Sequence, residues 1–414
     1  MLREQCELRA PGYSTPVEQA RCPGCGAADT DTFFYLDSTP VNCSALWPSR
    51  EDAINCTKGS IDLALCGKCG LIFNCRYEPD MLDYNARYDN SLSYSPTFRN
   101  YAKSLAQDLI ARHGLHSKRI IDIGSGKGEF LRLLCREGNN EGVGYDPSYS
   151  GNGNTGEIEG LRFVQDYYGE KYASESADFI CCRHVLEHIP EPLAFLRGLR
   201  STLRHRGEIA VYFETPNGQS VFSGPGLWDI IYPHVSYFTE DSLRAIFEQS
   251  GFTVLRTGIS FSNQFVFVEA RVGGNQPETN GTAATQTRRM VKEFETMFQQ
   301  TVDDWSHFLR SARRNGQRVA FWGAGAKGVT FLNVVPEARN VEFVIDLNNR
   351  KQGMYVPGTG QQIAGPSILK DTPLDYVISL NPVYEPEITA MLESMGTNAH
   401  VITNTKVRAL AASR

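Results

Sequence analysis

The feature that most limits the fold of this chain is a short apolar strand that runs into a glycine-rich loop and then into a helix. Residues 119–123, RIIDI, are followed by Gly124, Gly126 and Gly128, and residues 130–138, FLRLLCREG, continue as a helical stretch. Glycine lets a loop approach a bound ligand closely because it carries no side chain. A strand, a glycine loop and a helix in this order are typical of the ligand-binding turn of a doubly wound α/β sheet.

Further strand candidates alternate with helical segments along the middle of the chain. They are residues 141–146, 161–166, 177–182, 207–214, 252–260 and 265–272. The last two are predicted to form an antiparallel hairpin, whereas helical segments separate the others. The sequence therefore predicts a doubly wound sheet that contains one reversed strand.

The spacing of the three glycines differs from the dinucleotide-binding fingerprint, whose third glycine comes one residue later. It resembles motif I of class I methyltransferases, where the loop holds the methionine part of S-adenosylmethionine. Asp146 ends the next strand and is placed to accept both ribose hydroxyls, and Asp166 ends the third strand and matches the acidic residue that meets the adenine amino group. Three features at the ends of three successive strands predict an S-adenosylmethionine site.

The segment after the fourth strand, CCRHVLEHI, also resembles its counterpart in this superfamily. Arg183 and His184 are the residues nearest to the expected sulfonium. Glu187 and His188 recur in enzymes of many specificities, so a structural role is expected for both. The donor-binding residues expected from this resemblance are Tyr88, Asp122, Gly124, Gly126, Asp146, Asp166 and Arg183.

Two Cys-x-x-Cys knuckles precede the predicted sheet. Cys22 and Cys25 form one, Cys66 and Cys69 form the other, and a glycine follows each second cysteine. Four thiolates complete the tetrahedral shell that Zn²⁺ prefers. A redox-active pair is the alternative, but it normally opens a helix in a thioredoxin-like unit, which the sequence does not predict. We therefore expect a structural zinc module, because four thiolates leave the metal no open position for catalysis.

A segment after the fifth predicted strand, residues 228–238, has the sequence WDIIYPHVSYF. The zinc knuckles, the motif I loop, this Tyr-x-His-x-x-Tyr-Phe segment and a C-terminal Gly-Ala-Gly-x-Lys-Gly loop occur in an order that resembles the sugar C-methyltransferases of deoxysugar pathways. That family methylates C3 of a nucleotide-linked 4-keto-6-deoxysugar, and the histidine of the segment is its proposed base. The equivalent residue here is His234, but Pro233 stands where the family has a glutamate.

Carbon methylation beside a ketone explains why such residues are needed. The C–H bond is weakly acidic, so a base must remove the proton and a donor must stabilise the enolate oxygen. The resemblance implies that His234 is the base and Tyr232 the donor, with His184 as the next catalytic candidate. The alternatives for His234 are substrate contact without proton transfer, or packing ahead of the following helix. Glu214 and Asn217, after the fifth strand, are expected to contact the substrate.

A second strand, glycine loop and helix begin near the C-terminal end of the chain. Residues 318–328, RVAFWGAGAKG, contain a full Gly-x-Gly-x-x-Gly loop, and Asp346 ends the following strand. Taken alone, these features favour NAD binding and make an oxidoreductase the competing function. The family resemblance implies instead a Rossmann-like remnant that covers the acceptor and helps to hold its nucleotide through Gly323, Gly325 and Lys327.

The composition and charge restrict the class of protein. A net charge of −6 argues against a general nucleic-acid-binding surface. No stretch approaches the ~18 consecutive apolar residues of a membrane span, and the first residues lack the apolar core of a secretory signal. A cytoplasmic location is therefore expected, where most of the eleven cysteines stay reduced or bind metal. The protein is expected to be a monomer or a small homo-oligomer.

The chain is expected to divide into three parts. Residues 1–80 form the zinc-binding module, residues 81–272 the S-adenosylmethionine-dependent methyltransferase domain, and residues 273–414 a linker, a long helix over residues 288–314 and the Rossmann-like domain. The leading function is C-methylation of a nucleotide-linked keto-deoxysugar through a base-generated enolate, with S-adenosylmethionine and Zn²⁺ as cofactors. An O- or N-methyltransferase of another small molecule, an NAD-dependent oxidoreductase and a non-catalytic zinc-containing binding protein are the alternatives.

Overall fold

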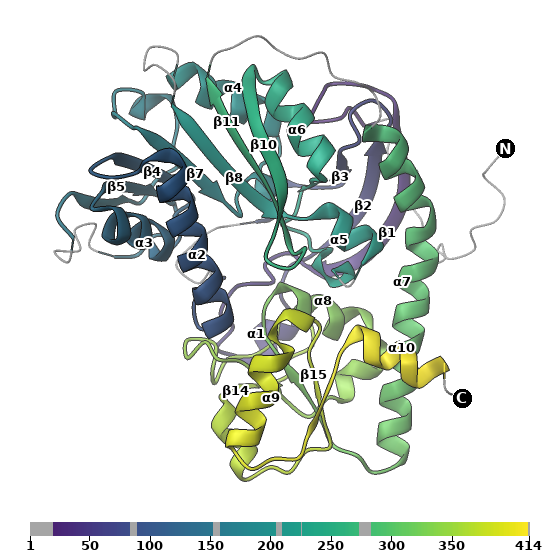
Figure 1. The fold of residues 1–414 in the computed structure, drawn as a ribbon. Helices are drawn as coiled ribbons and strands as arrows, with labels where there is room; N and C mark the ends of the chain where they lie inside the picture. Colours follow the sequence, from purple (N-terminus) through teal and green to yellow (C-terminus); the bar gives the residue numbers. More distant parts are fainter. Residues whose placement is uncertain are drawn as a thin grey trace.

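The computed structural model describes residues 20–82, 89–151, 158–203, 209–224, 226–272 and 283–412. Within these residues the strands form three sheets, of four, seven and five strands. Figure 1 shows the seven-stranded and four-stranded sheets beside each other in one half of the molecule and the C-terminal sheet in the other half, with the long helix α7 running along both halves. Among the described helices, none combines the length and the apolar character that crossing a membrane requires.

The seven-stranded sheet contains the predicted glycine loop. Its strands are β4 (Arg119–Ile123), β5 (Glu141–Tyr145), β6 (Leu161–Val164), β7 (Phe179–Arg183), β8 (Ala210–Pro216), β10 (Phe252–Ser260) and β11 (Phe265–Val272). Their order is β10-β11-β8-β7-β4-β5-β6, and all neighbouring pairs are parallel except the two that β11 makes. This confirms the predicted doubly wound sheet with one reversed strand. The winding reverses between β4 and β7, and the carboxyl ends of the strands at such a switch point form a ligand crevice.

Alternate residues of these strands point into two hydrophobic cores. Ile120 packs in the core beneath α2 and α3, whereas Ile121 and Ile123 pack in the core beneath α4 and α6. The helices are α2 (Pro96–His113), α3 (Glu129–Gly138), α4 (Pro192–Leu203) and α6 (Glu240–Gln249). Because both faces of the sheet are covered, the apolar strands are buried on both sides, as parallel sheets require.

The four-stranded sheet joins the cysteine-rich region to a distant segment of the chain. Its strands are β1 (Thr30–Pro40), β2 (Lys58–Cys66), β3 (Ile72–Asn74) and β9 (Ser236–Tyr237), and α1 (Arg50–Ile54) lies between β1 and β2 in sequence. Strand β9 pairs with β3 in antiparallel register, with Ile72 opposite Tyr237 and Phe73 opposite Ser236. The sequence did not predict β9, because two residues carry no alternating pattern. This pairing fixes the end of the segment that contains His234 against the N-terminal module.

The C-terminal region is a parallel five-stranded sheet that follows the long helix. Its elements are α7 (Ala283–Arg314), β12 (Val319–Trp322), α8 (Ala326–Val334), β13 (Val344–Ile345), β14 (Ile363–Ala364), β15 (Tyr376–Ile378), α9 (Glu385–Ser394), β16 (His400–Ile402) and α10 (Asn404–Ala412). The strand order is β14-β13-β12-β15-β16 and every neighbouring pair is parallel. This arrangement is the predicted Rossmann-like one, with β12, the strand of the glycine loop, at its centre. Strand β14 was not predicted, because it is only two residues long.

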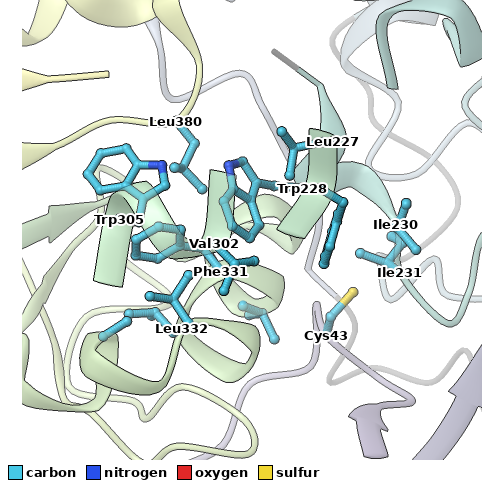
Figure 2. Close-up of a cluster of buried hydrophobic side chains, with 14 of the residues drawn as sticks. Cys43, Leu227, Trp228, Ile230, Ile231, Val302, Trp305, Phe331, Leu332 and Leu380 are labelled. Carbon is cyan, nitrogen blue, oxygen red and sulfur yellow. The ribbon is translucent and has the colours of Figure 1, made fainter. Parts of the chain in front are cut away.

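A buried cluster connects residues 228–238, the acceptor segment, to the C-terminal region. Figure 2 shows Trp228, Trp305 and Phe331, which come from the acceptor segment, α7 and α8, packed together. The ring centroids of Trp228 and Trp305 lie 5.0 Å and 5.1 Å from that of Phe331. Both indole N–H groups donate to Oδ1 of Asn404, at 3.1 Å and 2.8 Å, so this buried amide satisfies two donors at once.

Several short helical elements complete the described fold. They are α5 (Gly218–Ser223) and the 3₁₀ turns η1 (Pro79–Met81), η2 (Glu170–Tyr172), η3 (Leu186–His188), η4 (Leu227–Asp229), η5 (Pro336–Asn340), η6 (Pro366–Lys370) and η7 (Pro382–Tyr384). The turn η3 follows the carboxyl end of β7, and η4 lies at the start of the acceptor segment. These two turns place side chains in the candidate site.

Candidate active site

A cavity of about 1140 Å³ lies where the three parts of the fold meet. Its wall includes the glycine loop after β4, the turn η3, the acceptor segment and the C-terminal glycine loop. Cavities that hold one drug-sized ligand are typically about 300–1,000 Å³. This cavity is therefore large enough for two ligands side by side.

The glycine loop at one end of the cavity requires glycine at each of its three positions for a different reason. The φ angles of Gly124, Gly126 and Gly128 are 71°, 55° and 82°, which is the left-handed region. A Cβ at Gly124 would lie 2.1 Å from Cγ2 of Val185, and one at Gly128 would lie 2.1 Å from Cζ of Phe163. Apart from the adjoining residues of the loop, the described residues place no atom within 4 Å of a Cβ built at Gly126, so this glycine leaves room for a ligand at the cavity wall.

Two carboxylates follow the neighbouring strands, as the sequence predicts. Asp146 lines the cavity, and its Oδ2 accepts the N–H of Gly126 at 2.8 Å while its Oδ1 accepts the N–H of Ser148 at 2.8 Å. Asp166 also lines the cavity and accepts the Tyr172 hydroxyl at 2.6 Å. Asp146 therefore holds the glycine loop in place in addition to facing the cavity.

Asp122 precedes the loop at the end of β4. Its carboxyl group is buried, and the thiol of Cys181 donates to it at 3.2 Å. Burial raises the pKa of Asp122 to about 7. Asp122 and Arg183 both line the cavity, whereas the predicted donor-binding residue Tyr88 lies outside the described residues.

Glu214 lies behind the cavity wall and holds two of the predicted site residues. Its Oε1 accepts from Nε and a terminal nitrogen of Arg183 at 3.0 Å and 2.8 Å, and Nε2 of His184 lies 3.4 Å from the same oxygen. Its Oε2 accepts the hydroxyls of Tyr101, Tyr212 and Ser260. Although burial alone would raise the pKa of Glu214, Arg183 and these hydrogen bonds hold it well below its ordinary value. The structure thus gives Glu214 a positioning role, because its carboxylate is fully engaged and buried away from the cavity.

His184 has a strained backbone and a partly buried ring. Its φ of 57° is unusual for a residue with a side chain. The imidazole lies 4.5 Å, centroid to centroid, from Phe265, and burial lowers its pKa. His184 lines the cavity beside Arg183, on the wall that also contains the glycine loop.

His234 lies in the acceptor segment at the cavity wall and is buried. Its Nδ1 lies 3.2 Å from the backbone oxygen of Asp229, and a carbonyl oxygen can only accept, so Nδ1 carries the proton and Nε2 keeps a lone pair. Burial lowers the pKa of His234 to about 3, and the charge of Lys327 acts in the same direction. The His234 imidazole is therefore neutral at neutral pH, in the form that accepts a proton.

Tyr77 lies at the cavity wall, whereas Tyr232 does not. The Tyr232 hydroxyl accepts the N–H of Glu78 at 2.9 Å, and its ring fills the space left by Gly59, where a Cβ would lie 2.3 Å from Cε2 of the tyrosine. Tyr77 lines the cavity, with its ring centroid 5.5 Å from that of Tyr232. Burial raises the pKa of Tyr77 to about 12. No motif in the sequence distinguishes Tyr77 from the chain's other tyrosines.

The C-terminal glycine loop forms the opposite wall of the cavity. Gly323, Gly325 and Lys327 all line it, and Lys327 pairs with the carboxylate of Asp229. Asp346, the residue that would meet a ribose in a dinucleotide site, accepts the N–H of Ala324 at 2.7 Å and that of Asn348 at 2.8 Å. Asp346 thus holds the C-terminal glycine loop in the same way that Asp146 holds the first one, and it also lines the cavity.

Asn217 lies outside the cavity wall. Its Oδ1 accepts the N–H of Gln219 at 3.1 Å and caps the N-terminus of α5, and its Nδ2 donates to the backbone oxygen of Asn263 at 3.1 Å. Both ends of the amide are engaged, which is typical of a helix cap. The structure therefore gives Asn217 a structural position.

A buried carboxylate that the sequence did not predict connects the two glycine-loop regions. Asp89 accepts from Nζ of Lys127 at 2.7 Å, from Arg350 at 2.8 Å and from Nδ2 of Asn348 at 3.0 Å. Lys127 belongs to the first glycine loop, and Arg350 and Asn348 follow β13. Because its partners are distant in sequence, no local pattern marks Asp89.

The four predicted metal ligands come together away from the cavity. Sγ of Cys22 lies 3.6 Å from Sγ of Cys69, and Sγ of Cys25 lies 3.5 Å from Sγ of Cys66. All four sulfur atoms lie within 4.8 Å of one another. Zinc–sulfur bonds of about 2.3 Å in a tetrahedron place sulfur atoms about 3.8 Å apart. The four-cysteine cluster therefore fits a structural zinc site.

Two parts of the chain match known protein families. Residues 98–257 match the family model of a methyltransferase domain, and residues 276–403 match that of a C-methyltransferase C-terminal domain. The chain is 25% identical to the C-methyltransferase NovU of Streptomyces niveus over 90% of this chain and 91% of that protein. It is 28% identical to a ubiquinone biosynthesis O-methyltransferase of Erwinia tasmaniensis over 28% of this chain and 50% of that protein.

Solved structures of methyltransferases align with part of the chain. The magnesium protoporphyrin IX methyltransferase of Synechocystis PCC 6803 matches 43% of this chain and 84% of that chain, at 20% identity and a TM-score of 0.33. Both family models describe methyltransferase domains, and the relative from S. niveus aligns with 90% of this chain. The chain belongs to the C-methyltransferase family and is an S-adenosylmethionine-dependent methyltransferase.

Proposed function

We propose that this enzyme methylates a carbon atom beside the ketone of a nucleotide-linked keto-deoxysugar, through an enolate that His234 generates. The observation that carries the proposal is that one cavity is lined by the motif I loop, by His234 and by the C-terminal glycine loop. Donor, base and acceptor-binding groups are thus brought to one place by three different parts of the chain. A carbon acid needs this combination, because its proton must leave before the carbon can attack a methyl group.

The donor end of the cavity suits S-adenosylmethionine, which supplies the electrophilic methyl group when bound. Gly124 and Gly126 would lie against its methionine part, Asp146 would accept its ribose hydroxyls, and Asp166 would meet its adenine. Asp122 and Arg183 complete this end of the cavity.

At the acceptor end, His234 takes the proton from the substrate carbon at Nε2. The bond from Nδ1 to the Asp229 carbonyl orients the ring and stabilises the imidazolium that forms. Tyr77 at the cavity wall donates to the developing enolate oxygen, in the role that the family resemblance gives to Tyr232. Lys327 and the N–H groups at the start of α8 suit the diphosphate of the acceptor nucleotide.

Incubation with methyl-labelled donor and a panel of nucleoside-diphosphate sugars tests this function. We expect mass spectrometry to show one labelled methyl group in a product derived from a 4-keto-6-deoxysugar. Labelling of another class of small molecule, with none of the keto-sugars labelled, would contradict the sugar assignment and favour the O- or N-methyltransferase.

Substitution of Asp146 tests the methyltransferase function against the oxidoreductase alternative. Asp146→Ala is expected to weaken S-adenosylmethionine binding by about 1.5–3 kcal/mol, because it removes charge-assisted hydrogen bonds to the ribose and the bond that holds Gly126. Calorimetric titration with S-adenosylmethionine and with NAD measures this directly. Tight NAD binding without donor binding would contradict the assignment of the site.

We propose that the four-cysteine cluster holds about one structural zinc ion per chain. Cys66→Ser is expected to lower zinc content and the thermal midpoint together, because metal-binding energy in such a module is folding energy. Cys75→Ser is the matched control, since Cys75 lies next to the module and its thiol donates to the backbone oxygen of Asp62 at 3.1 Å, as a hydroxyl also can. Purified, folded protein without zinc by elemental analysis would contradict this site.

A further inference from the structure

The carboxylate that is missing before His234 has a counterpart elsewhere in the fold. Pro233 stands where the resembling family has a glutamate, so the neighbour in sequence cannot assist the imidazole. Glu187, on the turn η3 after β7, is 2% exposed and lines the cavity. A carboxyl oxygen of Glu187 and a ring nitrogen of His234 lie within 4.8 Å of each other.

Glu187 is an unusual group for a structural role. Neither of its carboxyl oxygens has a hydrogen-bond partner among the described residues, and Nε2 of His188 lies 4.0 Å from Oε1. An unpaired buried carboxylate costs several kcal/mol, so such a group must take up a proton or find a partner when the site works. Burial raises the pKa of Glu187 to about 8, and the nearby negative charges of Asp229 and Glu214 act in the same direction.

The backbone fixes Glu187 and His234 relative to each other. The N–H of Val235 donates to the backbone oxygen of Glu187 at 2.8 Å, and Nδ1 of His188 bonds to the backbone oxygen of Pro233 at 2.8 Å. These two hydrogen bonds join residues 187–188 to residues 233–235, one on either side of His234. Since Nδ1 of His234 is directed to the Asp229 carbonyl, its Nε2 is the nitrogen available for proton exchange.

We propose that Glu187 is the positioning residue of His234 and receives the proton that His234 removes from the substrate, which is a role that rests on the proposed function. The C–H bond breaks, its electron pair stays on the substrate as the enolate, and the proton binds Nε2 of His234. The proton then passes from Nε2, by way of one water molecule, to Glu187 in its ionised form, whose share rises as the pH approaches 8, and the imidazole becomes neutral again. One negative charge thereby moves from Glu187 to the enolate oxygen, and the proton returns to solvent through the cavity between turnovers.

Solvent deuterium exchange at the substrate carbon tests this role, with a nucleoside-diphosphate-linked 4-keto-6-deoxyhexose as probe and no methyl donor. Glu187→Gln is expected to slow exchange at least about tenfold, because the amide cannot take a proton. The affinity for S-adenosylmethionine, measured by calorimetry, should stay unchanged. Glu248→Gln is the matched control, because Glu248 is another buried carboxyl group, on α6 and outside the cavity wall, and its exchange should equal that of the wild-type enzyme.

Chemical rescue separates proton transfer from a packing role. Glu187→Ala should also exchange slowly, and added formate should restore exchange in proportion to its concentration, because a small carboxylate can enter the space left by the side chain. Normal exchange in Glu187→Gln, or a loss in Glu187→Ala that formate does not restore, would overturn the proposal. A second equivalent of bound metal that is lost in Glu187→Gln would also overturn it and show that Glu187, His188 and His234 hold a cation. His234→Ala distinguishes the two claims: slow exchange there with normal exchange in Glu187→Gln removes only the role of Glu187.

Discussion

Alanine in place of His234 is expected to lower turnover at least about a hundredfold, which is the contribution of a positioned general base. The neutral imidazole keeps a lone pair on Nε2 at the cavity wall, where His188 is the other histidine whose Nδ1 bonds to a backbone carbonyl. Donor affinity should change little, because the contacts of His234 are with the acceptor segment and His188 and not with the motif I loop.

Three measurements define this expected result. Steady-state kinetics give turnover, calorimetry gives the affinity for S-adenosylmethionine, and solvent deuterium exchange at the substrate carbon isolates proton removal from methyl transfer. His116→Ala is the matched control, since His116 is an exposed histidine outside the cavity wall. Normal exchange and turnover in His234→Ala would exclude His234 as the base and make His184 the next candidate. That result would also favour methylation of an oxygen or nitrogen atom, because such an atom is already a nucleophile.

The second large effect is expected on stability. Glu214→Ala should lower the free energy of unfolding by about 3–5 kcal/mol, because it leaves the buried Arg183 guanidinium without its partner. Three hydroxyl groups, of Tyr101, Tyr212 and Ser260, lose their acceptor at the same time. Arg183 and His184 would also lose their fixed positions at the cavity wall, so donor binding should weaken as well.

Denaturant unfolding followed by circular dichroism measures this loss. The ion pair of Arg318 and Glu342 serves as the control, because both side chains are about 40% exposed. Glu342→Ala should cost less than about 1 kcal/mol, as exposed ion pairs do. A loss in Glu214→Ala no larger than in this control would contradict the assignment of Glu214 as the group that holds Arg183 and His184.

The parts of the site that the sequence predicted are those that a short stretch of chain determines. The loop from Gly124 to Gly128 and the aspartates at the strand ends lie where the sequence places them, because each follows directly from one strand and its turn. The four cysteines meet for the same reason, since each knuckle is a local turn and only the pairing of the two knuckles is long-range.

The parts that the sequence could not predict depend on how distant segments pack. Tyr232 was expected at the active site, but β9 pairs the following residues with β3, and the Tyr232 hydroxyl meets the backbone of Glu78. That packing places Tyr77 at the cavity wall. Glu214 was expected to contact the substrate because it ends the fifth predicted strand. It lies instead between Arg183 and α2, and no sequence pattern shows that its carboxylate is already engaged.

Glu187 is another residue whose surroundings the sequence could not predict. The sequence assigned it a structural role, because the segment recurs in enzymes of many specificities. Its unpaired carboxyl oxygens and its place beside His234 follow from the contact between the turn η3 and residues 233–235, which are far apart in sequence. A residue that is common to many related enzymes can thus face a different neighbour in this one.

The position of the transferred methyl group tests the central claim most directly. The enzyme is incubated with S-adenosylmethionine that carries a ¹³C-labelled methyl group and with a nucleoside-diphosphate-linked 4-keto-6-deoxysugar, and the product is analysed by two-dimensional NMR. We expect the labelled methyl carbon to be bonded to the ring carbon beside the ketone, and Asp146→Ala and His234→Ala to give little of this product. A labelled methyl group bonded to oxygen or nitrogen, or a keto-sugar that stays unlabelled while another small molecule is methylated, would contradict the account.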